Sequence, residues 1–179
     1  MEIRTARLCL REFRAGDLAE LAAYQRDGRF TEVRGAGAGA PSCDLLESFI
    51  AWAGQEPRRN WQLAIALGDG VGDVVGCAGL RGEGWPADEA EFGIELAAEH
   101  WGQGIAGEAA RAMLGAGFGE LGMARVHAVS IGTNARVAAV LERLGFARVS
   151  DPPGLARLNR RPWSQVQWAQ ERNDWLAGT

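Results

Sequence analysis

A glycine-rich turn between a strand pattern and a helix pattern is the part of this sequence best suited to bind an anion. It carries Gly102, Gly104 and Gly107. At a helix start the first backbone N–H groups lack intrahelical acceptors, and the positive end of the helix dipole is exposed. Glycine has no Cβ, so a ligand can approach this backbone closely. The turn therefore predicts a binding site for a phosphate or a pyrophosphate.

The residues on either side of the turn define the elements that must position it. From Glu89 to Leu96 apolar and polar residues alternate, which is the pattern of a half-buried strand. After the turn, apolar residues recur at helical spacing, namely Ile105, Ala109, Ala112, Met113 and Ala116. The turn thus lies where a strand ends and a helix begins.

Three interpretations of the turn compete. A dinucleotide-binding G-x-G-x-x-G motif needs an acidic residue at the end of the following strand, but the predicted strand from Arg125 to Ile131 ends without one. A nucleoside triphosphate loop needs a Gly-Lys-Ser/Thr ending, and the chain contains no lysine. The third interpretation is a helix start whose glycines serve only close packing.

Global properties indicate a small globular protein. The chain has 179 residues, of which 47% are hydrophobic, so one domain spanning 1–179 is expected. Its net charge of −4 argues against nucleic acid and anionic membranes as partners. The N-terminus lacks the apolar core of a signal peptide, which predicts a cytoplasmic location. Three cysteines and two histidines argue against a disulfide framework or a metal site.

The remaining elements follow from periodicity. Strands are expected at Arg7–Arg11, 61–67, 74–80, 146–149 and 162–171, and helices after Asp17 and Ser42 and over 134–144. The segment from Gly28 to Ala40 has no useful period and is expected to be a loop. An antiparallel meander followed by a β-α-β unit predicts an α/β (α+β) fold.

The order of motifs resembles the GNAT superfamily of acyl-CoA N-acetyltransferases. The motifs are an opening T-x-R-L-x-L-R, the turn W-G-Q-G-I-A, the strand R-V-H-A-V-S-I, a helix that opens at an asparagine and closes in L-G-F, and a terminal Asp174-Trp175. Within it the sequence is most similar to the RimJ/RimL-like branch, which acetylates the N-terminal alanine of ribosomal proteins. The resemblance implies a mixed, mostly antiparallel sheet of about seven strands flanked by about four helices, with a homodimer as a possible assembly.

The resemblance also implies acetyl-CoA as cosubstrate and assigns residues to it. The pyrophosphate would be bound by the turn, and the main chain at Leu96 would pair with the pantetheine arm and polarise the thioester carbonyl. Asn134 would contact coenzyme A, although its position is equally that of a helix N-cap. The turn residues concerned are Trp101, Gly102, Gln103, Gly104, Ile105, Ala106 and Gly107.

Candidate proton-transfer residues are less clear. Glu91 lies where several GNAT enzymes carry their general base, with Glu95 as an alternative on the same strand face; both are also plausible solvated carboxylates. Many GNAT enzymes carry a tyrosine in the last helix as the general acid that protonates the leaving thiolate, and this chain has Leu141 at that position. The RimJ/RimL-like branch often has a serine three residues after the asparagine, where this chain has Val137. The only tyrosine, Tyr24, is distant in sequence from this helix. Ser130 and Thr133 are further, weaker candidates for the general acid.

An α-amine is favoured as the acceptor. Its reference pKa is ~7.8 against ~10.4 for lysine, so deprotonating lysine at neutral pH costs about 3.5 kcal/mol more. An acidic cluster around the turn favours a cationic amine; it comprises Asp88, Glu89, Glu91, Glu95 and Glu99. The expected function is acetyl transfer to a primary amine, either a protein or peptide N-terminus or a small amino compound. A non-catalytic acyl-CoA-binding module and an aminoglycoside-type antibiotic acetyltransferase remain alternatives.

Overall fold

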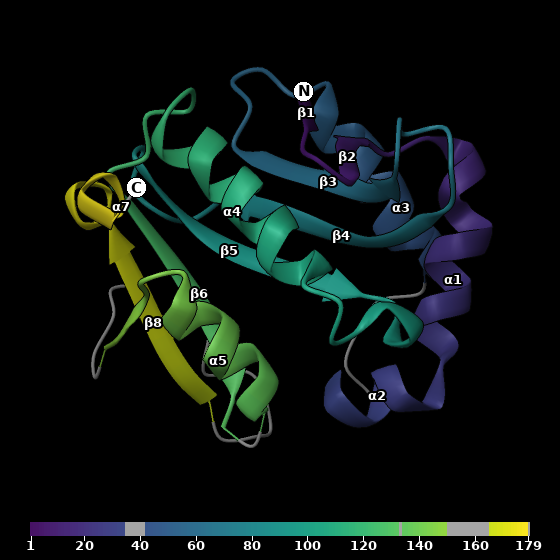
Figure 1. Ribbon diagram of the computed structural model, residues 1–179. Helices are drawn as coiled ribbons and strands as arrows, with labels where there is room; N and C mark the ends of the chain where they lie inside the picture. Colours follow the sequence, from purple (N-terminus) through teal and green to yellow (C-terminus); the bar gives the residue numbers. More distant parts are fainter. Residues whose placement is uncertain (35–41, 133, 150–164, 179) are drawn as a thin grey trace.

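One eight-stranded sheet runs through the protein, with strand order β1-β2-β3-β4-β5-β6-β8-β7. The computed structural model describes residues 1–34, 42–132, 134–149 and 165–178 (Figure 1). The strands are β1 Glu2–Arg4, β2 Leu8–Glu12, β3 Asn60–Leu67, β4 Val74–Arg81, β5 Glu89–Leu96, β6 Arg125–Ile131, β7 Ala147–Arg148 and β8 Gln165–Glu171. All neighbours pair antiparallel except β5 and β6, which are parallel.

Helices cover both faces of this sheet (Figure 1). They are α1 Leu18–Arg26, α2 Gly28–Arg34, α3 Ser42–Ala53, α4 Ile105–Phe118, α5 Ala135–Arg143 and α7 Arg172–Gly178, with 3₁₀ turns η1 Ala15–Asp17 and η2 Ala98–His100. The predicted mixed, mostly antiparallel fold is confirmed. The part of the chain that the structure describes holds eight strands where about seven were expected and six α-helices where about four were expected. None of the described helices is long and apolar enough to cross a membrane.

One predicted loop is wrong. Between Gly28 and Ala40 the structure has helix α2, which begins at Gly28. Its Phe30 is 6% exposed and packs edge-on against the Tyr24 ring at 5.4 Å between centroids. Packing against α1 therefore fixes a short helix that local sequence does not signal. The remaining residues of that predicted loop, 35–40, and the first residues of the predicted strand at 162–171 lie outside the described residues.

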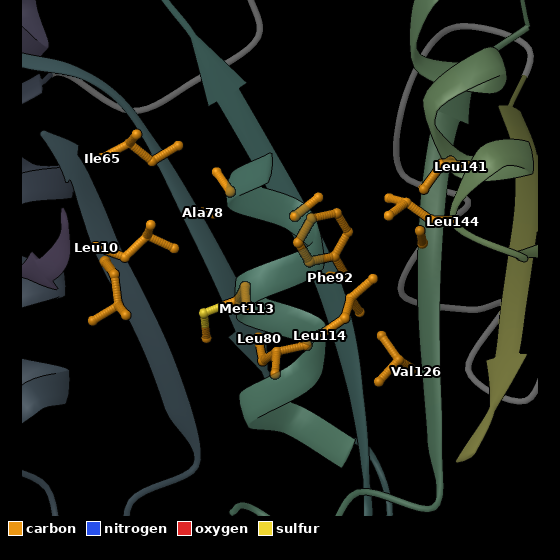
Figure 2. Close-up of a cluster of buried hydrophobic side chains, with 14 of the residues drawn as sticks. Leu10, Ile65, Ala78, Leu80, Phe92, Met113, Leu114, Val126, Leu141 and Leu144 are labelled. Carbon is orange, nitrogen blue, oxygen red and sulfur yellow. The ribbon is translucent and has the colours of Figure 1, made fainter. Parts of the chain in front are cut away.

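The core between the sheet and α4 is apolar and closely packed. Figure 2 shows Met113 and Leu114 of α4 among side chains from β2, β3, β4 and β5. Phe92 on β5 faces Leu141 and Leu144, which extends this core to the segment of α5 (Figure 2). A second apolar cluster covers the opposite face of the sheet. Helices α1, α2 and α3 and the segment before η1 supply most of its large side chains. Its members are Phe13, Leu21, Tyr24, Phe30, Leu46, Phe49, Ala64, Val74, Cys77 and Ala97.

The parallel pair β5 and β6 separates along its length. Its register runs only from Glu89 opposite Arg125 to Phe92 opposite Ala128. Beyond this point β5 continues to Leu96 beside β4, whereas β6 continues to Ile131 beside β8. We call the opening between the two strands the fork; Figure 1 shows the strands diverging from each other there. Parallel strands that part in this way leave backbone groups of both facing edges available for an inserted chain.

Candidate active site

The start of α4 lies open beside the fork. Gly104 is its N-cap residue, with φ of 78°, and Gly102 has φ of 76°. These left-handed conformations explain why glycine stands at both positions. The amides from Gly102 to Gly107 donate to no acceptor among the residues that the structure describes. A Cβ placed on Gly102 or Gly107 would meet nothing within 4 Å, so both positions border open space.

Side chains from distant segments hold the turn in place. Arg7 donates through Nη1 to the carbonyl of Gln103 at 2.9 Å and through Nε to Glu108 at 2.6 Å. The Thr5 hydroxyl donates to the same carboxylate at 2.6 Å. Trp101 donates its indole N–H to the carbonyl of Leu96 at 2.8 Å. The turn is therefore anchored to the N-terminal segment and to the end of β5. Its backbone amides from Gly102 to Gly107 make no hydrogen bond to any described residue.

The start of α5 lies on the other side of the fork. Asn134 caps it, because its Oδ1 accepts from the amide of Val137 at 3.1 Å. The guanidinium carbon of Arg136 lies 5.1 Å from the centroid of the Trp101 ring, which links the two helix starts by a cation–π contact. An open helix start, a free strand edge and a nearby amide side chain fit a ligand that carries a diphosphate at one end and an extended amide arm at the other.

Glu91 is paired rather than free. Its carboxylate, 16% exposed, contacts Nη2 of Arg81 at 3.0 Å. The Arg81 guanidinium passes over Gly93, where a Cβ would lie too close to it, and also donates to Gln62 at 3.3 Å. These groups lie on the sheet face opposite α4. If Glu91 accepted a proton, its carboxylate would become neutral and the Arg81 guanidinium would lose its charged partner.

Glu95 has different surroundings from Glu91. Its carboxylate accepts from Nε2 of Gln25 at 3.1 Å and from the hydroxyl of Tyr24 at 3.4 Å. Cys77 lies beside them, 3.6 Å from the tyrosine oxygen. Burial raises the pKa of Tyr24 well above its ordinary value and raises the pKa of Cys77 to about 12, so both groups keep their protons. Sequence reasoning missed Tyr24, since only the docking of α1 on β4 brings it there.

The other proton-transfer candidates are occupied by packing. Leu141 is 2% exposed and belongs to the main core. Ser130 is 4% exposed, and its Oγ accepts from the indole of Trp168 at 2.9 Å. Thr133 lies outside the described residues. The structure thus brings together the turn, Leu96 and Asn134 around the fork, whereas Glu91 and Glu95 lie on the face opposite α4.

Part of the predicted acidic cluster is engaged in contacts with other side chains. Glu91 pairs with Arg81, and Glu89 contacts Nε2 of His127 at 2.6 Å.

A separate cavity of about 280 Å³ lies between α1, the beginning of β4 and η2. Four carboxylates line it, those of Glu20, Asp27, Asp73 and Glu99. No group of three or more His, Cys, Asp or Glu among the described residues is arranged to hold a metal ion.

A curated protein is similar to part of this sequence. The FsC-acetyl coenzyme A-N(2)-transacetylase of Aspergillus fumigatus is 31% identical over 97 residues, which cover 50% of this chain and 39% of that protein. The chain thus spans well under two thirds of the length of this curated relative.

Solved structures match over nearly the whole chain. An acetyltransferase from Agrobacterium tumefaciens superposes with a TM-score of 0.76 at 24% identity, covering 96% of this chain and 94% of that one. The ribosomal-protein-S5-alanine acetyltransferase from Vibrio fischeri superposes with a TM-score of 0.77 at 16% identity, covering 98% of each chain. At these identities the similarity establishes the fold.

The sequence match to a family is broader. Residues 7–147 match the family described as "Acetyltransferase (GNAT) domain", and this range contains the turn, the fork and both helix starts. The protein therefore belongs to the GNAT acetyltransferase family.

Proposed function

We propose that the protein is an acetyl-CoA-dependent N-acetyltransferase that acts on a primary amine by direct attack in a ternary complex. The observation that carries this proposal is the uncapped start of α4, whose amides from Gly102 to Gly107 have no acceptor among the described residues and open beside the fork. Amides at a helix start favour a diphosphate. The proposed ligand contacts are those of Trp101, Gly102, Gln103, Gly104, Ile105, Ala106 and Gly107.

The fork supplies the second half of the proposed site. Coenzyme A would contribute an acetyl thioester, and the free edge of β5 up to Leu96 would pair with the amide arm that carries it. A main-chain N–H near Leu96 would donate to the thioester oxygen, where negative charge develops. Asn134 keeps its side-chain NH₂ group for the ligand, because the cap uses only Oδ1.

An α-amine is the acceptor that this site suits best. It needs about 3.5 kcal/mol less than lysine for deprotonation at neutral pH. Family membership and the superposition on a ribosomal-protein alanine acetyltransferase support an N-terminal peptide or a small amino compound. Glu91 is the residue that the sequence predicted as the general base. It is paired with Arg81 on the sheet face opposite α4, where we place the acceptor amine, and its negative charge attracts an ammonium group there.

Thiol release measures this function directly. The purified protein is incubated with acetyl-CoA and peptides that begin with Ala or Ser, their N-acetylated counterparts, a lysine-containing peptide with a blocked N-terminus, and a panel of small amines that includes aminoglycosides. We expect CoA release with the free N-termini and none with the blocked ones. Turnover of lysine side chains alone would reject the preference for the α-amine.

A non-catalytic acyl-CoA-binding module is the second candidate. One observation favours it: Leu141 is buried in the core at the position where many relatives carry a tyrosine, so α5 offers no hydroxyl there. Stoichiometric acetyl-CoA binding without amine-dependent CoA release across the whole panel would favour the module over the enzyme.

A further inference from the structure

His127 forms a hydrogen-bonded pair with a carboxylate near the beginning of β5 and β6. Its side chain is 2% exposed, and its Nε2 lies 2.6 Å from Oε2 of Glu89. An ionised carboxylate only accepts hydrogen bonds, so Nε2 carries the hydrogen. This arrangement fixes the tautomer of the neutral ring and leaves the lone pair on Nδ1.

The other ring nitrogen has no partner. Nδ1 of His127 is buried and makes no hydrogen bond with any described residue. Leaving such an atom without a partner costs about 1–3 kcal/mol, so a functional reason is expected. The indole of Trp85 stacks on the imidazole at 4.0 Å between centroids and 14° between planes. Arg59 holds the loop of Trp85, since its guanidinium donates to the carbonyls of Gly82, Trp85 and Pro86.

This pair lies next to the fork. His127 is opposite Glu91 in the β5–β6 register, and the next pair, Phe92 with Ala128, is the last before the strands separate. Register partners in parallel strands point to the same face, so His127 and Glu91 share the face opposite α4. The fork therefore opens one residue beyond the imidazole, and Leu96 lies four residues beyond Phe92 along β5.

We propose that His127 is the general base of the reaction and that Glu89 positions it. This assignment rests on the proposed acetyl transfer to an amine. Nδ1 takes one proton from the ammonium of the acceptor, directly or through one water molecule. The amine nitrogen then forms a bond to the thioester carbon and the carbon–sulfur bond breaks. A second proton leaves the nitrogen and ends on the CoA sulfur, while the proton on the imidazole passes to solvent.

His127 is better placed to accept a proton than Glu91. Protonation of Glu91 would leave the charge of Arg81 without its partner at 3.0 Å. Protonation of His127 instead creates an imidazolium that is paired with Glu89 and stacked on Trp85. Two further charged groups lie at this end of the face. Arg59 donates to the carbonyls of the Trp85 loop, and Arg125, opposite Glu89 in the register, is paired with Glu171 at 3.1 Å. Glu91 then retains an electrostatic role toward the ammonium.

The pH dependence of kcat and kcat/KM tests the assignment. Histidine changes charge between about pH 5 and 8, so a base of this kind gives an ascending limb in that range. The profile is measured with two acceptors, an N-terminal peptide and a simple alkylamine, because a limb that belongs to the enzyme does not move with the acceptor. The variant His127→Gln retains a group that can bond to Glu89. We expect it to lose about 100-fold or more in kcat and to lose the limb.

Two further variants separate catalysis from structure. His100→Gln removes the only other imidazole of the chain and is expected to keep both rate and limb. Glu89→Gln keeps a hydrogen-bond acceptor for Nε2 but removes the charge, which should move the limb to lower pH by about one unit. Coenzyme A affinity, measured by calorimetry, should be unchanged in both His127→Gln and Glu89→Gln.

Each result has a defined consequence. An unchanged limb in His127→Gln overturns the assignment, even if the rate falls. If His127→Gln does not fold, Glu89→Gln decides, and a limb that stays in place overturns the assignment. A wild-type protein that binds acetyl-CoA but acetylates no amine overturns the proposed function and this base with it. A protein that acetylates amines while its limb moves with His100 rather than His127 overturns the base alone.

Discussion

The two helix starts that border the fork differ in how their first amides are used. At α4, Gly104 offers no side chain, and the amides up to Gly107 have no acceptor among the described residues. At α5, Asn134 accepts from the amide of Val137 and so closes one of the free positions. Both helices pack on the same core, so packing does not explain the contrast.

The contrast separates a binding end from a structural end. A helix start without a side-chain cap loses about 1 kcal/mol of stability. Such a start is expected where another partner, here a ligand, accepts hydrogen bonds from the free amides. The turn before α4 compensates with external supports, namely the hydrogen bonds of Arg7 and Thr5. The α5 start needs no such support, because its own asparagine supplies the cap.

The substitution Gly107→Asp should break the contrast most strongly. A side chain fits there, since a Cβ would meet nothing within 4 Å, and an acidic residue in the first turn is favourable to the helix dipole by about 0.3–1 kcal/mol. The same charge repels a bound diphosphate, so we expect CoA affinity to fall about 100-fold or more, equivalent to about 2.7 kcal/mol. Calorimetry with CoA and thermal unfolding measure the two effects.

Gly115→Asp is the matched control for that variant. Gly115 lies on the same helix, and its Cβ would also meet nothing within 4 Å. The acidic side chain is there remote from the turn, so CoA affinity should stay at the wild-type value. Wild-type affinity in Gly107→Asp would show that the α4 start is not the diphosphate site.

Removing the support of the turn should have an intermediate effect. In Arg7→Gln the side-chain bonds to the Gln103 carbonyl and to Glu108 are lost, so only the bonds of Thr5 and of the Arg7 amide to Glu108 still hold the start of α4 from the N-terminal segment. We expect CoA to bind about 10-fold more weakly, or about 1.4 kcal/mol. Arg4→Gln is the control, because Arg4 pairs with no described residue other than the exposed Glu2. Equal affinities for the two variants would contradict a supporting role of Arg7.

The α5 start should respond in stability more than in binding. Asn134→Ala removes the cap of Val137 and should lower the free energy of unfolding by about 1 kcal/mol. Asn134→Ser restores an oxygen that can cap but not the side-chain NH₂ group. If both variants lose the same CoA affinity, the NH₂ group binds the ligand. If Asn134→Ser instead recovers CoA affinity along with stability, the asparagine acts as a cap alone.

Local patterns were enough to predict the elements around the fork. The change from alternation to helical spacing near residue 100 marks the end of β5 and the start of α4, as the structure has them. The predicted cap at Asn134 is also present. The periodicity and the cap both involve residues that are close in sequence. The local sequence is therefore sufficient to predict the end of β5 and the starts of α4 and α5.

Contacts between distant segments could not be predicted in the same way. The pairs Arg81 with Glu91 and Glu89 with His127 depend on the registers of β4 with β5 and of β5 with β6. A shift of one residue would turn each side chain to the other face, and the sequence does not fix the register that closely. The contact of Tyr24 with Glu95 and the helix α2 depend likewise on how the early helices dock.

Acid should weaken the α4 start without affecting the α5 cap, and this is the smallest effect we expect. Burial alone would raise the pKa of Glu108, but hydrogen bonds from Thr5 and Arg7 outweigh it and lower that pKa below its ordinary 4.5. The charged carboxylate therefore stabilises the fold above about pH 4.5, and this contribution is lost as the pH falls through the lowered value. The α5 start has no acidic residue in its first turn.

Comparison of the wild type with Glu108→Gln measures this contribution. The glutamine keeps an oxygen for the hydrogen bonds but not the charge, so the wild type should be more stable at pH 7 by about 0.5–1 kcal/mol. Denaturant unfolding at several pH values should show the difference shrink below pH 4.5 and vanish once the carboxylate is protonated. The same series in the Asn134→Ala background should give the same pH dependence, because the two helix starts are stabilised independently. A difference that grows toward low pH would mean that Glu108 destabilises the turn in its charged form, and the support of the α4 start would then be assigned to the bond from Arg7 to the Gln103 carbonyl instead.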